Sequence, residues 1–107
     1  MTEETRTLRY LLRGLRRDFP VRRLRVCRRR ISQPKVGNEY AYATKTKRGF
    51  TIVIHRTIGI PLMIELLLHE YAHVLCWKTG RDHDHIWADK YASLRRWYQE
   101  EEEWSAE

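Results

Sequence analysis

The sequence is poor in cysteine, proline and glycine. It contains two cysteines, three prolines and five glycines among 107 residues, which excludes a disulfide-rich scaffold and a collagen-like or low-complexity chain. Cys27 and Cys76 each lie in a segment that we expect to be ordered. We therefore predict two buried free thiols rather than a disulfide bridge.

The sequence also lacks a long apolar run. Its longest apolar stretch, Ile58–Leu68, is interrupted by Pro61 and Glu65, and it is much shorter than the roughly 20 residues that cross a bilayer. The first residues are acidic and then rich in arginine, without the apolar segment of a secretory signal. We therefore expect a soluble, intracellular protein located in the cytoplasm.

Charge is distributed unevenly along the chain. Residues 1–60 carry 16 basic and 4 acidic side chains, a net charge of +12, whereas residues 61–107 carry 5 basic and 10 acidic ones, a net charge of −5. Such a basic half is suited to anionic partners. Residues 6–30 hold eleven arginines, a density typical of nucleic-acid binding, although a solvated basic face that complements the acidic half is the alternative. The arginines stand at positions 6, 9, 13, 16, 17, 22, 23, 25, 28, 29 and 30.

Hydrophobic periodicity and turn residues predict three helices and three strands, which we assign to one domain of residues 1–107. Four leucines and a phenylalanine at helical spacing make the first helix amphipathic. The predicted helices span residues 3–17, 62–77 and 86–104, and the predicted strands span residues 21–31, 40–46 and 50–55. This order predicts an α+β fold with a three-stranded, mostly antiparallel sheet.

The apolar helix predicted at 62–77 carries the pattern H-E-x-x-H. His69 and His73 are four residues apart, so they share one helix face and can direct ring nitrogens at one point. Zinc favours imidazole nitrogen as a ligand, and Glu70 stands where it can reach a metal-coordinated water as a general base. Two imidazoles and a carboxylate in an apolar helix are costly unless a metal or hydrogen bonds satisfy them. A buried polar cluster without metal is the alternative.

A catalytic zinc needs a third protein ligand and one open coordination position. Four of the five histidines lie between residues 69 and 85. We predict His83 as the third ligand because it comes first after the loop, with His85 and Asp89 as alternatives. Asp82 and Asp84 are suited either to orient a ligand imidazole or to cap the last helix.

These residues resemble the SprT-like zinc metallopeptidases, including the Spartan and WLM branches. In that family H-E-x-x-H is followed at variable distance by a histidine, a small or acidic residue, two variable residues and an aromatic, and residues 83–87 fit this pattern. The resemblance implies that His69, His73 and His83 are zinc ligands and that Glu70 is the catalytic acid and base. It also implies a zincin-like minimal domain built from a leading helix, a three-stranded sheet and an active-site helix.

The sequence therefore predicts a zinc metalloendopeptidase that acts on a protein or peptide, with recruitment to nucleic acid through residues 6–30 as an additional hypothesis. Glu70 would take a proton from the attacking water and pass it to the leaving amine. The candidates to stabilise the oxyanion are Tyr71, Tyr91, His55 and His85, and a structural role is the alternative for each of them.

The strand predicted at 50–55 precedes the helix that carries the motif, and an edge strand near the zinc is suited to pair with an extended peptide. Two alternative functions remain. One is a basic nucleic-acid-binding module whose zinc site is structural or catalytically silent. The other is a small metal-dependent hydrolase of non-peptide amides.

Overall fold

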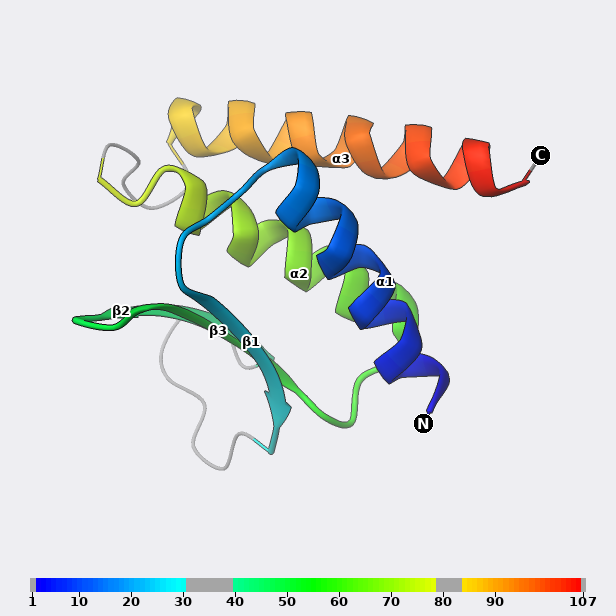
Figure 1. Cartoon of the computed structure of the whole chain (residues 1–107), viewed down its shortest axis with the longest axis horizontal. Helices are drawn as coiled ribbons and strands as arrows, with labels where there is room; N and C mark the ends of the chain where they lie inside the picture. Colours follow the sequence, from blue (N-terminus) through cyan, green and yellow to red (C-terminus); the bar gives the residue numbers. More distant parts are fainter. Residues whose placement is uncertain (1, 31–39, 79–83, 107) are drawn as a thin grey trace.

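The chain folds into three helices and one three-stranded sheet, which confirms the predicted α+β class. The computed structural model describes residues 2–30, 40–78 and 84–106. In chain order the elements are α1 (Glu3–Asp18), β1 (Leu24–Arg29), β2 (Ala41–Thr46), β3 (Gly49–His55), α2 (Ile60–Leu75) and α3 (His85–Ala106). All three helices lie on one side of the sheet (Figure 1).

The sheet is mixed rather than mostly antiparallel, so this part of the prediction is wrong. The strand order is β1-β3-β2. β1 runs parallel to β3, while β2 and β3 form an antiparallel pair. The hairpin residues show that β2 and β3 are neighbours, but alternation of side chains does not encode the direction of β1. β3 lies in the centre with both edges paired, so among the described strands β1 and β2 are the ones with an outer edge that could accept a peptide.

The hairpin between β2 and β3 depends on Gly49. Its φ angle is +137°, and a Cβ atom added there would lie 2.2 Å from the carbonyl oxygen of Arg23. The same carbonyl accepts a hydrogen bond from the backbone N–H of Phe50, at 3.0 Å. Glycine thus allows the start of β3 to approach the residue that precedes β1.

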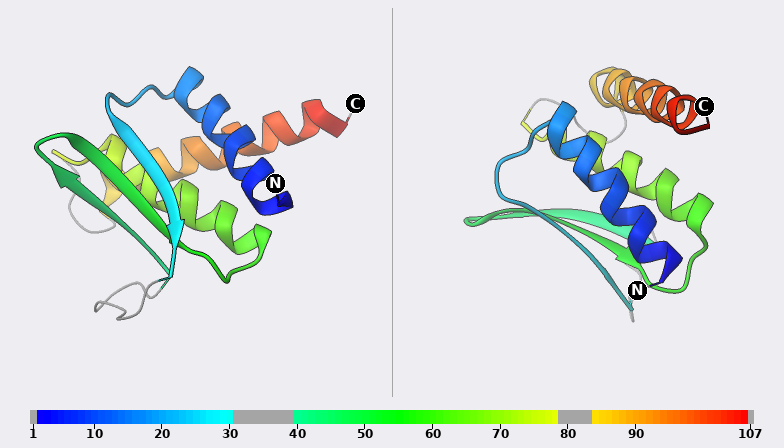
Figure 2. Two further views of the ribbon diagram at one scale, coloured as in Figure 1. Left: turned by 60° about the horizontal axis from the view of Figure 1, so that its bottom comes forward. Right: turned by 45° about the vertical axis from the view of Figure 1, so that its right-hand side comes forward.

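The hydrophobic core lies around α2, which is placed between the sheet and α3, with α1 packed alongside it (Figure 2). The α1 leucines at positions 8, 11, 12 and 15 are all buried, as their spacing predicts. On the sheet, Ile52 and Ile54 of β3 are fully buried, as are Met63 and Leu67 of α2. Contact on several sides explains why α2 is apolar over most of its circumference.

Both cysteines are free thiols, as predicted. Cys76 is buried directly after α2, and Cys27 is half-buried in β1. Within the described parts of the chain, no helix combines the length and the apolar character that crossing a membrane requires.

Candidate metal centre

His69 and His73 form a close pair of imidazoles on α2. Their ring centroids lie 5.0 Å apart, and the ring planes are inclined by 67°. A zinc–nitrogen bond of about 2.0–2.1 Å puts a ring centroid about 3.2 Å from the metal, so two rings at the tetrahedral angle have centroids about 5 Å apart. The spacing of this pair therefore fits two ligands of one zinc ion.

Glu70 is a buried acid beside this pair. It is 5% exposed, and its Oε1 atom lies 4.0 Å from Nε2 of His69. Burial raises the pKa of Glu70 from 4.5 to about 7, and no hydrogen bond to its carboxylate is found among the described residues. A nearby cation would favour the ionised form. Burial therefore favours the neutral form of Glu70 when no cation lies nearby.

An aromatic wall from α3 covers one side of the imidazole pair. The Trp87 ring centroid lies 4.9 Å from that of His69 and 5.4 Å from that of His73. The indole Nε1 donates a hydrogen bond of 3.3 Å to the backbone oxygen of His69. Tyr91 stacks on Trp87, with centroids 5.0 Å apart and planes inclined by 10°. This wall restricts the orientations that the imidazoles can adopt.

Asp84 holds the start of α3 and so positions this wall. Its Oδ1 atom accepts a hydrogen bond from the backbone N–H of Trp87 at 3.0 Å, and its carbonyl accepts one from Ala88 at 2.9 Å. These are the bonds of a helix N-cap. Of the two roles considered for Asp84, capping is therefore the one that these hydrogen bonds show.

The third predicted ligand, His83, lies outside the described residues, as does Asp82. Over residues 2–30, 40–78 and 84–106, no group of three or more His, Cys, Asp or Glu side chains is arranged to hold a metal. His85 and Asp89 lie exposed within the described part of α3. Neither alternative ligand therefore joins His69 and His73 in this structure.

Tyr71, one of the four oxyanion candidates, does not face the imidazoles, which favours its alternative, structural role. It is fully buried, and its hydroxyl donates to the backbone oxygen of Phe19 at 2.6 Å, just beyond the end of α1. Consecutive helix residues are about 100° apart around the axis. Tyr71 is therefore turned about 200° from His69 and serves the interface with α1.

Two of the other three oxyanion candidates also lack a described contact with the pair. His55 ends β3 and bonds to Thr57 through Nδ1, at 2.9 Å from the hydroxyl. His69 lies nine residues into α2, about 14 Å from the helix start that follows His55. His85 is exposed. Tyr91 is the candidate that lies nearest, with its ring centroid 6.1 Å from that of His69.

A polar cluster next to the pair was missed by sequence reasoning. Tyr91 donates a 2.6 Å hydrogen bond to Oε2 of Glu65, and Arg95 forms an ion pair with Oε1 of the same carboxylate. Glu65 precedes His69 by four residues and so lies on the same face of α2. Tyr91 and Arg95 are also four residues apart, on α3. The four-residue spacing on each helix can be seen in the sequence. The contact of Glu65 on α2 with Tyr91 and Arg95 on α3 cannot.

No protein-family model matches this chain, and no curated protein or solved structure matches it. The function must therefore be inferred from the residues themselves. The strongest functional signal is the paired imidazoles of His69 and His73 beside the buried carboxylate of Glu70.

Proposed function

We propose that this chain is a zinc-dependent metallopeptidase of the SprT-like type. In this proposal His69, His73 and His83 hold the zinc ion, and Glu70 is the general base and acid. The observation that supports it most strongly is the 5.0 Å imidazole pair next to a carboxylate that is 5% exposed. Such a group of polar side chains in an apolar helix is costly unless a metal or hydrogen bonds satisfy it.

When bound, zinc supplies a Lewis acid that polarises a carbonyl and makes a nearby water more acidic. Glu70 accepts a proton from the attacking water and delivers it to the leaving amine. Its burial suits both steps because a general base works best with a pKa near the working pH. Trp87 limits the motion of both imidazoles and shields one side of the pair from solvent.

The substrate side of the proposal rests on the free strand edges. β2 packs against α2, and among the described strands it pairs on one edge alone, with β3. An extended peptide can add to such an edge through main-chain hydrogen bonds. We assign the peptide to the edge of β2 because β2 belongs to the part of the sheet that α2 covers.

Substitution of Glu70→Gln tests the catalytic role. The variant should lose about 10²- to 10⁴-fold in the rate of hydrolysis of an unfolded protein substrate, the range typical of a lost general base. Its zinc content should be unchanged. Glu100→Gln, which removes an exposed charge from α3, is the matched control and should keep the full rate. Hydrolysis by Glu70→Gln at the rate of the wild type would contradict the proposal.

The arginines support the alternative of a basic nucleic-acid-binding module with a structural or catalytically silent zinc site. Ten of the eleven arginines in residues 6–30 are exposed, and the exception is Arg28. Exposed guanidinium groups contact phosphates and give binding that weakens steeply with salt. Retention of DNA should therefore be measured against salt concentration, and the hydrolysis assay should be run with and without DNA. DNA binding with no hydrolysis by either the wild type or Glu70→Gln would favour this alternative.

A further inference from the structure

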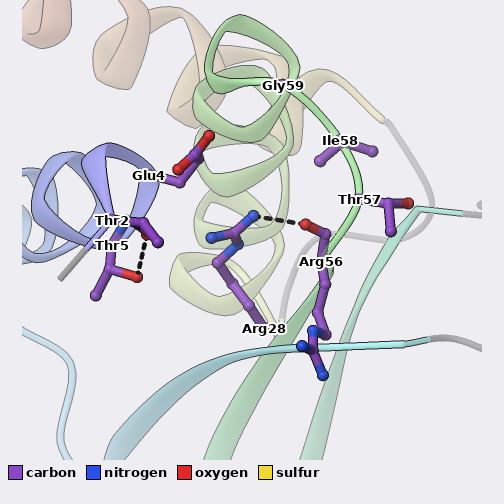
Figure 3. Close-up of a pocket in the computed structure, with 8 residues that line it drawn as sticks. All are labelled: Thr2, Glu4, Thr5, Arg28, Arg56, Thr57, Ile58 and Gly59. Carbon is purple, nitrogen blue, oxygen red and sulfur yellow. Dashed lines mark hydrogen bonds between the residues drawn. The ribbon is translucent and has the colours of Figure 1, made fainter.

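A second polar site lies at the other end of α2, away from the imidazole pair. It is an open cavity of about 590 Å³ between the start of α1, the end of β1 and the turn that leads into α2. Thr2, Glu4 and Thr5 line it from α1, Arg28 lines it from β1, and residues 56–59 complete it (Figure 3). Neither histidine of the candidate metal centre contributes to this cavity.

Arg28 occupies a position where the strand pattern predicts an apolar side chain. Leu24, Val26 and Arg28 alternate along β1 and therefore point to the same face of the sheet. Val26 and Arg28 pair with Ile52 and Ile54 of β3, which are both fully buried beneath the helices. A charged side chain on this inner face breaks the local pattern, which is more common at functional positions than elsewhere.

The guanidinium of Arg28 uses only part of its hydrogen-bonding capacity. Its Nη2 atom donates to the backbone oxygen of Arg56 at 2.7 Å (Figure 3). Its Nε atom is buried and, in the described part of the chain, is the only buried side-chain nitrogen or oxygen without a hydrogen-bond partner. A guanidinium has five N–H donors, and an unsatisfied buried donor costs free energy. Because Nε is buried, an anion in the cavity would be bound by the remaining N–H groups of the two Nη atoms.

The surroundings of Arg28 favour an anion. Gly59 is the N-cap residue of α2 and gives the helix no side-chain capping bond. The start of α1 borders the same cavity through Thr2 and Thr5, and helix amino ends attract negative charge. Glu4 is the one acidic residue in the lining, and it forms no ion pair with Arg28 within the described residues. Its carboxylate opposes anion binding without neutralising the arginine.

We propose that this cavity binds a phosphate-type oxyanion, held by the guanidinium of Arg28 near the amino end of α2. A tetrahedral oxyanion accepts several hydrogen bonds, and guanidinium is suited to bind it through two parallel N–H groups. The ligand can be free phosphate or a phosphate group of a larger molecule. The site does not depend on the zinc proposal, because it shares no residue with the imidazole pair.

Unfolding of the full chain in phosphate and in chloride, at equal ionic strength, tests the site. At a phosphate concentration ten times the dissociation constant, the folded-to-unfolded ratio should rise about elevenfold. Arg28→Met should abolish this rise. Arg25→Met is the matched control, because it removes the same charge from an exposed position on the other face of β1, and it should keep the rise. Glu4→Gln should lower the phosphate concentration needed, because it removes the opposing charge.

A binding titration with inorganic phosphate and with a short DNA strand distinguishes the sources of the phosphate group. Loss of phosphate binding in Arg28→Met but not in Arg25→Met supports the site, and the same pattern with DNA identifies the ligand as a nucleic-acid phosphate. Equal losses in both variants would show that only general charge attraction acts, which overturns the proposal. Equal effects of phosphate and chloride on the wild type, or no gain in Glu4→Gln, would overturn it as well.

Discussion

The buried polar side chains of α2 differ in their hydrogen bonding from one side of the helix to the other. On the side toward α1, Tyr71 is fully buried, and its hydroxyl is bonded to the backbone oxygen of Phe19 at 2.6 Å. The preceding residue, Glu70, is 5% exposed, and no hydrogen bond to its carboxylate is found in the described chain. The Tyr71 hydroxyl is hydrogen-bonded within the protein, whereas Oε1 of Glu70 lies 4.0 Å from Nε2 of His69, beyond hydrogen-bond distance. The first arrangement stabilises a fold, whereas the second is typical of a site that binds something from outside.

The packing on the two sides differs in the same way. The α1 side consists mainly of leucines, whose contacts require only apolar shape and volume. The α3 side instead presents Trp87 and Tyr91, which contact His69 through ring edges and faces. These contacts fix directions as well as volume. The comparison therefore supports a structural role for the α1 side of α2 and agrees with the proposal that the α3 side carries the zinc site.

The largest effect expected on stability comes from Glu70 in the metal-free protein. Burial raises its pKa from 4.5 to about 7. Between pH 4.5 and pH 7, Glu70 therefore holds a proton in the folded state that it has released in the unfolded state. The free energy of unfolding should therefore fall as the pH rises from 4.5 to 7, by about 3 kcal/mol. Below pH 4.5 the group is protonated in both states and has no such effect.

Glu70→Gln should remove this pH dependence. Denaturant unfolding of both metal-free proteins from pH 4 to 8 measures it, with the variant more stable by about 3 kcal/mol at pH 8 and equal to the wild type near pH 4. If the free energy of unfolding depends on pH in the same way for both proteins, burial does not raise the pKa of Glu70. The proposed difference between the two sides of α2 would then disappear.

On the α1 side, Tyr71→Phe should lower the free energy of unfolding by about 1–3 kcal/mol, because the backbone oxygen of Phe19 loses a buried donor. Zinc binding should stay the same, since the hydroxyl points away from His69. Tyr10→Phe serves as the control, because Tyr10 is 57% exposed. A loss of zinc affinity in Tyr71→Phe would mean that the two sides are not separate in function.

The smallest effect is expected at Asp84, the N-cap of α3. Asp84→Ala should cost about 1 kcal/mol, because the backbone N–H of Trp87 loses its capping partner. Asp89→Ala, which changes an exposed residue inside the same helix, should cost less. Urea unfolding of the two variants makes the comparison. Equal losses would show that the cap does not hold the aromatic wall in place.

Much of the fold was predictable because periodicity records which side of each element is buried. The leucine spacing predicted α1, and the two strands predicted at 40–46 and 50–55, separated by a short turn, correspond to the β2–β3 hairpin. The parallel direction of β1 was not predictable, because side-chain alternation is the same for both directions. Strand order depends on how the chain crosses from β1 to β2, and local pattern does not specify that crossing.

The candidate site was predictable only along single helices. The four-residue spacing of His69 and His73 predicts a shared face, and their rings lie 5.0 Å apart. Contacts between helices were not predictable, such as those of Trp87 with both imidazoles and of Glu65 with Tyr91. The sequence alone did not exclude Tyr71 from the oxyanion candidates, since that required the direction of its side chain on the helix.

Equilibrium zinc binding tests the central claim most directly. The wild type should bind one zinc ion per chain, and His69→Ala and His73→Ala should each lose that binding. His55→Ala should keep it, because His55 lies at the end of β3 beside Thr57. A wild type that binds no zinc, or binding that His69→Ala and His73→Ala leave unchanged, would contradict the account.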